Sequence, residues 1–272
     1  MEDYSILMSV YWKEKAEYLK ESIDSMLNQT VMSNDFVIVC DGPLTKELDG
    51  VIEEMEKKRP GLFQIIRLER QKGLGNALRH GVAYCRNERI ARMDSDDVSV
   101  SDRCEMQLLA LEERQADLVG GNIIEFSDSV SNTGAGRKVP ETDAEIRKFA
   151  KRRNPFNHPS VMFRKSSVLK AGNYMDCPGF EDYYLWVRML SCGMRGYNIQ
   201  KDLVYMRTGE GMYKRRGSFS YAMLGIKARW KIYQTGYSAL PDFLISAGGQ
   251  LLVSIIPLKL RTYFYGKFLR RN

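Results

Sequence analysis

Residues 89–97 read Arg-Ile-Ala-Arg-Met-Asp-Ser-Asp-Asp, a short apolar run that ends in three carboxylates, Asp94, Asp96 and Asp97. The run favours a buried β-strand over residues 89–93. Carboxylates this close together repel one another unless a cation or water screens them. A hard divalent cation, which binds carboxylate and diphosphate oxygens, would do so. An acidic helix start is the alternative, because aspartate also caps helices, and the segment by itself leaves both interpretations open.

Similar apolar runs precede this segment at residues 4–10, 36–40 and 63–68. Between them, residues 13–29 and 48–58 carry apolar side chains at helical spacing, and a third helix is expected from about residue 76. Strands that alternate with helices indicate a parallel sheet with right-handed crossovers. We therefore expect an α/β fold with a Rossmann-like, mostly parallel central sheet that is flanked by helices.

Polar residues and glycines follow the predicted strand ends, namely Tyr11, Asp41, Gly73 with Gly75, and Asp94 with Asp96. Ligands of parallel sheets bind beyond the carboxyl ends of the strands. The stretch 72–77, Lys-Gly-Leu-Gly-Asn-Ala, resembles half of a phosphate loop and opens a helix whose N-terminus favours anions. It is neither a Walker motif nor a complete G-x-G-x-x-G, so nucleotide hydrolases and dehydrogenases are poorly supported.

The second half of the chain has a different pattern: a helix over 102–114, a strand over 118–124, a polar loop over 126–139, a strand over 160–163 and an amphipathic helix over 182–192. Glu181 and Asp182 open the last helix directly after Pro178-Gly179. The helix dipole favours an acidic pair there. A general base beside a sugar donor is the functional alternative.

Composition narrows the class of protein. The chain has 272 residues, 44% of them hydrophobic, which is enough for a large core, and it has no visible repeat. Its net charge of +7 is uneven, since residues 195–272 contain 14 Lys and Arg against 3 Asp and Glu. A basic C-terminal third suits an anionic partner such as phosphate or acidic lipid, although a solvated basic face is also possible.

The five cysteines are scattered, and no basic segment precedes an apolar stretch at the N-terminus. We expect reduced thiols and a cytoplasmic protein without a secretory signal. The two histidines, His80 and His158, offer no zinc-binding spacing. A catalytic metal would therefore be held by carboxylates, which favours Mg²⁺ or Mn²⁺.

Taken together, five segments resemble the family 2 inverting glycosyltransferases of GT-A fold: 5–11, 38–42, 73–77, 94–97 and 181–183. Residues 157–163 (Asn-His-Pro-Ser-Val-Met-Phe) are also similar to members that build bacterial capsule, exopolysaccharide and O-antigen chains. The resemblance covers about residues 4–200. Each motif is weak by itself, whereas the ordered set is specific.

The resemblance implies roles for individual residues. The nucleotide-sugar would lie against Ser9, Tyr11, Asp41, Lys72, Gly75, Asn76, Asp94 and Ser95. Asp96, with Asp94 nearby, would bind Mn²⁺ or Mg²⁺. Asp182 would be the catalytic base, and Glu181 beside it would contact donor or acceptor. His158 and Trp186 are further candidates for contact with either substrate, although a single histidine before proline is more often structural.

Two departures from the family pattern matter. The turn Cys40-Asp41-Gly42 has one acid where many members have two, so nucleotide recognition there depends on one carboxylate. Arg229-Trp230 lacks the full Q-x-x-R-W of processive synthases, so a single addition is expected. The resemblance thus implies transfer from a nucleotide diphosphate sugar, most simply a UDP-sugar, to a glycan or an undecaprenyl-diphosphate-linked acceptor.

Three parts of the chain are expected. Residues 1–98 would bind the nucleotide-sugar, 99–215 would complete the GT-A domain with the acceptor and catalytic side, and 216–272 would form a basic helical tail. Residues 243–258 carry no charge but are too few for a spanning helix. Basic and aromatic residues follow them, which favours contact with the inner face of the cell membrane over a helix that closes the core.

Two other classes of protein were weighed. A sugar-nucleotide pyrophosphorylase would need a glycine-rich basic loop near the N-terminus, and residues 9–13 do not provide one. A non-catalytic protein that binds anionic ligands such as nucleic acid would leave the acids of 94–97 and 181–182 unexplained. We expect no nucleic-acid partner.

Overall fold

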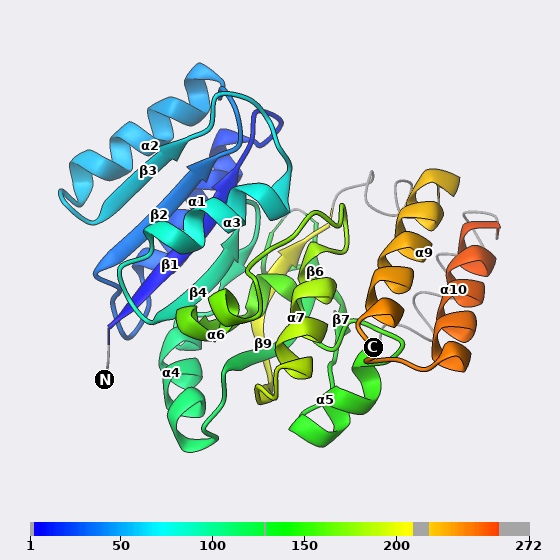
Figure 1. Cartoon of the computed structure of the whole chain (residues 1–272). Coiled ribbons are helices and arrows are strands. Elements are labelled where there is room, and N and C mark those ends of the chain that lie inside the picture. The colour runs from blue at the N-terminus through cyan, green and yellow to red at the C-terminus, as the bar shows by residue number, and fades with distance from the viewer. Residues whose placement is uncertain (1–2, 128, 209–217, 256–272) are drawn as a thin grey trace.

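The computed structural model describes residues 3–127, 129–208 and 218–255 (Figure 1). Their strands form one sheet of the order β3-β2-β1-β4-β8-β6-β9-β5, with β7 paired to β6. The first four strands are parallel: β1 (Tyr4–Val10), β2 (Asp35–Cys40), β3 (Phe63–Arg67) and β4 (Arg89–Asp94). This part agrees with the parallel sheet that the sequence predicts.

The second half of the sheet is mixed. Its strands are β5 (Val98–Ser99), β6 (Leu118–Phe126), β7 (Thr133–Arg137), β8 (Met162–Arg164) and β9 (Gly196–Arg207). Strand β6 is parallel to β9 but antiparallel to β7 and β8, and β8 joins the two halves by pairing antiparallel with β4. The sheet is therefore continuous from the N-terminal strands to β9.

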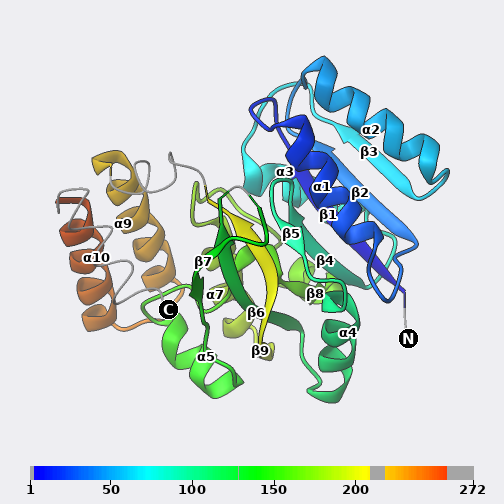
Figure 2. The same cartoon turned by 180° about the vertical axis from the view of Figure 1, so that it is seen from behind.

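Helices cover both faces of the sheet. One face carries α1 (Ala16–Leu27), α2 (Lys46–Lys58) and α4 (Arg103–Glu113) (Figure 2). The other face carries α3 (Leu74–Tyr84), α6 (Lys165–Lys170) and α7 (Glu181–Ser191) (Figure 1). Each set buries its apolar stripe on the sheet, since strands β1 and β2 are buried on both sides.

The C-terminal helical extension is also present. α9 (Phe219–Gln234) and α10 (Leu240–Ile255) pack together beside α7 and α5 (Asp143–Ala150) (Figure 1). The basic and aromatic residues of the expected tail, 259–271, lie outside the described residues. Among the helices that the structure describes, none combines the length and the apolar character needed to cross a membrane.

Two local predictions were wrong. The expected loop 126–139 contains β7, whose Thr-Gly-Ala-Gly-Arg sequence lacks an apolar alternation but has small residues that fit closely beside β6. The expected strand 160–163 begins two residues later, at Met162, because a 3-10 turn, η1 (His158–Ser160), precedes it. The Ser160 hydroxyl stabilises this turn by donating to the carbonyl oxygens of Gly121 and Asn157.

Strand register brings the polar strand ends to a common edge. Ser9 of β1 lies opposite Val39 of β2 on one side and Asp94 of β4 on the other. The main-chain N–H of Asp41, just beyond β2, donates to the carbonyl oxygen of Val10 at 2.8 Å. The carboxyl ends of β1, β2 and β4 are therefore level, as the ligand site of a parallel sheet requires.

Candidate active site

The site begins with a buried cation on β4. Side chains alternate along a strand, so Ile90, Arg92 and Asp94 share one face of the sheet. Arg92 is only 1% exposed, and its guanidinium donates to both carboxylate oxygens of Asp94, with Nη1 at 2.7 Å from Oδ2. A planar fork of this kind fixes the carboxylate in orientation as well as in charge. The carboxylate of Asp94 is therefore already neutralised by Arg92.

A second acidic segment lies within electrostatic range of the same guanidinium. Glu181 and Asp182 form the first turn of α7, where the helix dipole favours carboxylates. Burial and the neighbouring Asp182 charge raise the pKa of Glu181 to about 7, and burial also raises the pKa of Asp182. The Arg92 charge opposes both shifts. One buried guanidinium therefore acts electrostatically on acids that lie far apart in the sequence.

The amide of Asn154 holds the carboxylate of Asp182 in place. Its Nδ2 donates to Asp182 Oδ2 at 2.5 Å, while the main-chain carbonyl oxygen of Asn154 accepts from Arg137 Nη2 at 2.6 Å. One hydrogen bond thus fixes the main chain of Asn154, and the other fixes the orientation of its amide toward Asp182. A positioned carboxylate with a raised pKa is a suitable general base.

Asp96 and Asp97 occupy the turn after β4. Burial, followed by the charges of Asp94 and Glu14, raises the pKa of Asp96 to about 7. Burial and the Asp96 charge raise the pKa of Asp97 well above its ordinary value. The carboxylates of this turn therefore repel one another, as the sequence predicts, and a bound cation would reduce that repulsion.

Arg207, the last residue of β9, clamps this acidic turn. Its main-chain N–H donates to Asp97 Oδ1 at 2.8 Å, and its Nε donates to the carbonyl oxygen of Asp96 at 2.9 Å. The guanidinium lies between the rings of Tyr18 and Phe126, with centroids at 3.9 and 4.3 Å. A residue from the second half of the chain therefore sets the main-chain position of Asp96.

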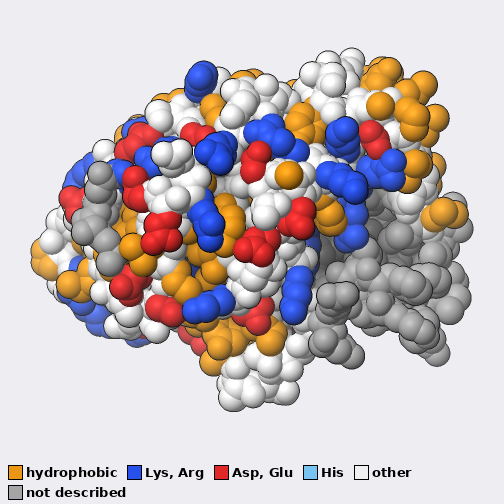
Figure 3. Space-filling model, turned by 90° about the horizontal axis from the view of Figure 1, so that it is seen from below, with side chains coloured by type: hydrophobic (Ala, Val, Ile, Leu, Met, Phe, Trp, Pro, Cys, Tyr) orange, Lys and Arg blue, Asp and Glu red, His pale blue; other side chains and the backbone are white. Residues whose placement is uncertain are grey.

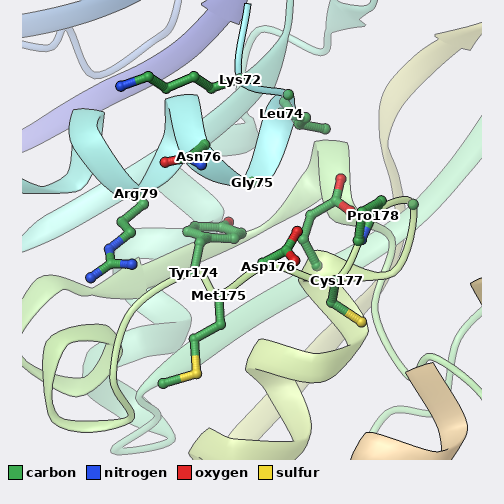
Figure 4. Close-up of a pocket in the computed structure, with 13 residues that line it drawn as sticks. Lys72, Leu74, Gly75, Asn76, Arg79, Tyr174, Met175, Asp176, Cys177 and Pro178 are labelled. Atoms are coloured by element: carbon green, nitrogen blue, oxygen red, sulfur yellow. The ribbon is translucent and has the colours of Figure 1, made fainter. Parts of the chain in front are cut away.

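The glycine loop forms one wall of a cavity of about 280 Å³ that Glu181 also lines (Figure 4). Lys72, Asn76 and Arg79 line one side, and residues 174–179 line the other, with Glu181 on the same lining. The carboxylate of Asp41 fixes the loop, because it accepts from the main-chain N–H groups of Lys72 and Gly73 at 2.7 and 2.9 Å. The two sides come from α3 and from the segment before α7.

Gly75 allows α3 to approach α7 closely. A Cβ atom at this position would lie 2.9 Å from Glu181 Cβ and 3.3 Å from its Cγ, which is too close without movement. The glycine loop and the Glu181-Asp182 pair are therefore in direct contact. The structure brings together Lys72, Gly75, Asn76 and Glu181 around this cavity.

The remaining predicted nucleotide residues lie at the same strand ends. Ser95 is buried, and its hydroxyl donates to Glu14 Oε2 at 2.7 Å. Ser9 and Tyr11 lie at and just beyond the end of β1, and the Tyr11 carbonyl oxygen accepts from the Glu14 N–H at 3.0 Å. The loop after β1 and the acidic turn after β4 are thus joined through Glu14.

His158 and Trp186 pack against each other in the interior of the protein. His158 Nε2 is 3.0 Å from the hydroxyl of Tyr174, and burial followed by the Arg92 charge lowers its pKa, so the imidazole is neutral. Trp186 is 0% exposed and packs its ring against His158, Tyr174 and Phe156. A fully buried ring presents no surface to a ligand, which differs from the expected substrate contact of Trp186. Its place is in the core that supports the site.

Sequence reasoning missed Arg92, Asn154, Tyr174 and Arg207. Only Arg92 carried a usable pattern: it is a charged residue inside an apolar strand, on the same face as Asp94. The other three lie in segments whose partners are distant in the sequence, so no local pattern indicates their position.

No group of three or more metal-binding side chains exists among the described residues. Asp94 is committed to Arg92, whereas the half-buried carboxylate of Asp96 pairs with no cation in the described part of the chain. Such a site fits a divalent cation that takes one or two carboxylates from the protein and the remaining ligands from a bound diphosphate.

Comparison with protein families decides the class of enzyme. The family model described as glycosyl transferase family 2 matches residues 5–172, which include β1 to β8 and the acidic turn. The chain belongs to glycosyl transferase family 2. The expected family and its GT-A architecture are thereby confirmed, and so is the prediction of a glycosyltransferase. The pyrophosphorylase and non-catalytic alternatives are set aside.

Relatives of this transferase act in bacterial polysaccharide synthesis. It is 35% identical to the Escherichia coli UDP-Gal:alpha-D-GlcNAc-diphosphoundecaprenol beta-1,3-galactosyltransferase, over 98% of this chain and 97% of that protein. It is 33% identical to the amylovoran biosynthesis glycosyltransferase AmsE of Erwinia amylovora, over 97% and 98% of the two chains. Both matches extend through the C-terminal helices, beyond the segment that the family model covers.

A solved structure agrees in fold. The mannosyltransferase PcManGT from Pyrobaculum calidifontis, in complex with GDP-Man and Mn²⁺, superposes with a TM-score of 0.63 at 13% identity, over 96% of this chain and 83% of that one. At this identity the likeness concerns the fold. It supports a mixed α/β sheet between two helical layers as a GT-A architecture.

Proposed function

We propose that this transferase moves a sugar from a UDP-sugar to a hydroxyl of a lipid-linked glycan, with inversion at the anomeric carbon, in bacterial surface polysaccharide synthesis. The observation that carries the proposal is the position of Arg92, which pairs with Asp94 and lies close enough to Asp96, Glu181 and Asp182 to oppose the rise in the pKa of each. This position supports the proposal that the acidic turn would bind the diphosphate and that Asp182 would lie within reach of the same substrate. The named activity of the Escherichia coli relative supports UDP and an undecaprenyl-diphosphate acceptor.

The donor would lie along the level strand ends. Ser9, Tyr11 and the glycine loop that Asp41 supports would enclose the base and ribose. Lys72 and Asn76 line the cavity beside Glu181, where a cationic side chain and the N-terminus of α3 favour an anionic group. In this arrangement residues 1–98 hold the nucleotide, whereas 99–215 present the acceptor and the base.

The residues present fit a divalent cation that is shared with the donor, for the reasons given above. Asp96 would hold it, and Asp94, fixed by Arg92, would stay at the edge of its coordination shell or contact the ribose. When bound, Mn²⁺ or Mg²⁺ would neutralise charge on the departing diphosphate. The Pyrobaculum structure, which contains Mn²⁺ with GDP-Man, supports this cofactor.

Asp182 would act as the base. Its carboxylate, positioned by Asn154, accepts the proton of the acceptor hydroxyl while that oxygen attacks the anomeric carbon from the face opposite the diphosphate. The bond to the diphosphate breaks as the new glycosidic bond forms, which inverts the configuration. Glu181, at the junction of the cavity and the base, would orient the sugar or the acceptor hydroxyl.

A lipid-linked acceptor would place the enzyme at the cytoplasmic, inner face of the cell membrane. The C-terminal helices would make that contact, because α10 exposes apolar side chains. The tail residues 259–271 lie outside the described residues and take no part in this argument.

The decisive experiment is transfer from UDP-sugars to a synthetic GlcNAc-diphospho-lipid, with Mn²⁺, followed by chromatography of the product. We expect product with at least one UDP-sugar and an anomeric configuration opposite to that of the donor by NMR. Retention of configuration, or transfer from other nucleotide sugars alone, would refute the proposal. An Asp96→Asn variant and a chelator-treated sample serve as controls, and both should abolish transfer.

A further inference from the structure

Helix α10 carries an apolar stripe that faces away from the protein. The stripe consists of Pro241, Leu244, Ile245, Gly248, Gly249 and Leu252, at the i, i+3, i+4 spacing of one helix face. Leu244, Ile245 and Leu252 are 58%, 55% and 65% exposed. The opposite face packs on α9, where the ring of Phe243 lies 5.5 Å from that of Trp230. Among the described residues, none covers this second apolar face of α10.

A basic cluster borders this stripe. It consists of Lys148 of α5 and the residues after that helix, Lys151, Arg152 and Arg153, all of them exposed. Together with Gln200 and Asp242 they line a cavity of about 810 Å³. Seen from below, Lys and Arg side chains gather beside hydrophobic side chains on the side of the molecule that carries α9 and α10 (Figure 3).

The stripe and the cluster form one surface. Arg152 Nε lies 2.6 Å from Asp242 Oδ1, and Asp242 is in the first turn of α10, next to Pro241 at the edge of the stripe. Two further acids at the cavity accept hydrogen bonds from neutral groups and keep their charge: Glu145 accepts from the N–H of Thr142, and Glu141 accepts from the hydroxyl of Tyr197. The four cations of the cluster outnumber the three acids Glu141, Glu145 and Asp242 by one, so the net charge of this surface is positive.

We propose that the α10 stripe and the basic cluster dock together on an anionic lipid bilayer, a proposal that rests on the lipid-linked acceptor of the proposed function. Apolar side chains at one helix face enter the interface between headgroups and acyl chains, while adjacent cations contact lipid phosphates. The docking surface includes the described residues alone, so it does not depend on the basic tail.

This surface is connected to the base by a short piece of chain. Arg153 belongs to the basic cluster, and the next residue, Asn154, holds the carboxylate of Asp182. Docking at this surface therefore fixes the orientation of the acceptor side of the site relative to the bilayer. The position suits an acceptor whose lipid remains in the membrane while its sugar reaches the base.

The other occupant of an apolar stripe would be a second copy of the chain. In a symmetric dimer about this surface, the basic clusters of both copies would be brought toward each other. Like charges that approach across an interface oppose association. An anionic bilayer has the complementary charge, which is why we commit to lipid.

The test is sedimentation of the full chain with vesicles of phosphatidylglycerol and phosphatidylcholine, and with vesicles of phosphatidylcholine alone. We expect binding to the anionic vesicles and at least about tenfold weaker binding to the neutral ones. Leu244→Ser/Ile245→Ser and Lys148→Glu/Lys151→Glu should each weaken binding to anionic vesicles at least about tenfold. Circular dichroism checks that both variants are folded.

Matched control variants show whether the loss of vesicle binding depends on where the substitutions lie or only on the kind of residue replaced. Lys46→Glu/Lys57→Glu on α2 makes the same charge change far from α10, and Met32→Ser/Leu109→Ser removes exposed apolar groups elsewhere. Both controls should bind anionic vesicles within about twofold of the unsubstituted chain. Equal losses in the controls, or an unchanged Leu244→Ser/Ile245→Ser variant, would overturn the proposal. A dimer in light scattering that this variant alone disrupts would also overturn it, in favour of a second copy.

Failure of this proposal is distinguishable from failure of the proposed function. Vesicle binding is measured without donor, whereas transfer is measured with a short-chain acceptor in detergent, where no bilayer exists. The docking variants should keep transfer within about threefold in detergent, because no residue of the site is altered. Loss of transfer in detergent by these variants would contradict a docking role.

Discussion

A buried arginine among acids is the residue on which the site depends. Arg92 is fully buried, pairs with Asp94 and acts electrostatically on Asp96, Glu181 and Asp182. The single Arg92 charge does not balance these four acids and the neighbouring Asp97, so the ligand-free site keeps an excess of negative charge. That excess is a reason to expect a bound divalent cation.

Replacing Arg92 tests this balance. Arg92→Met leaves Asp94 without its partner, and we expect a loss of about 3 kcal/mol in the free energy of unfolding, measured with urea. Mn²⁺ should restore more stability to this variant than it adds to the parent, because the cation compensates some of the lost charge. Arg92→Lys keeps the charge without the planar fork and should lie between the two. Equal effects of Mn²⁺ on parent and Arg92→Met would contradict the argument.

Asp182→Asn tests the base. The amide can still accept the Asn154 hydrogen bond but cannot take a proton, so we expect kcat to fall about 10²–10⁴-fold. The KM for the UDP-sugar should stay within about threefold, since the donor contacts are unchanged. Steady-state kinetics measures both. Asp102→Asn on the surface before α4 is the matched control, and a comparable loss there would mean that the effect is not specific.

At the scale of elements, the contact between α3 and α7 would join the proposed donor site to the proposed base. Gly75→Ala places a Cβ atom 2.9 Å from Glu181 Cβ, so one helix start has to move. We expect kcat/KM to fall at least about tenfold and stability to fall by about 1–3 kcal/mol.

Gly50→Ala in α2 is the matched control for this substitution. A Cβ atom there has no heavy atom within 4 Å, so the change should gain up to about 1 kcal/mol through helix propensity. Its kinetics should be those of the parent. Full activity of Gly75→Ala would show that α3 and α7 tolerate separation.

The elements themselves were largely predictable. The four parallel strands and α1 to α4 were found within a few residues, because each has a clear apolar period and ends at a turn residue such as Asp41. The mixed half was harder. β7 lacks an apolar pattern, and β9 alternates buried residues with exposed ones only partly, so both depend on pairing with β6.

The sequence predicts which residues of the candidate site lie at strand ends, but it does not predict the hydrogen bonds that connect them. The carboxylates were visible because acids after apolar runs are conspicuous. The contacts that orient them, from Asn154 to Asp182 and from Arg207 to the acidic turn, join residues far apart in the chain. Tertiary packing sets such contacts, and no sequence period encodes them.

For the whole molecule, stability should depend on pH through the acidic site. The pKa of Glu181 and that of Asp96 are each raised to about 7, whereas an unfolded chain titrates these groups near 4.5 and 3.8. The folded protein therefore holds protons that the unfolded chain has released. Their contribution to stability is fully present below about pH 4 and is lost as the pH rises to about 7.

Ligand binding should reverse this trend. UDP with Mn²⁺ requires ionised acids, so the rise in melting temperature on adding both should be larger at pH 8 than at pH 5.5. Differential scanning fluorimetry across this range measures the difference. The variant Asp96→Asn/Glu181→Gln should show a flatter profile. A ligand effect that is larger at pH 5.5 would contradict the pKa directions.

The clamp of Arg207 on the acidic turn has a consequence for how the protein is made. During translation, residues 94–97 leave the ribosome well before residue 207, the last residue of β9, has been added. Until then nothing holds the main chain of Asp96 from that side. The nascent chain thus acquires the hydrogen bonds that fix its acidic turn late, and an incomplete polypeptide that stops before this arginine lacks them.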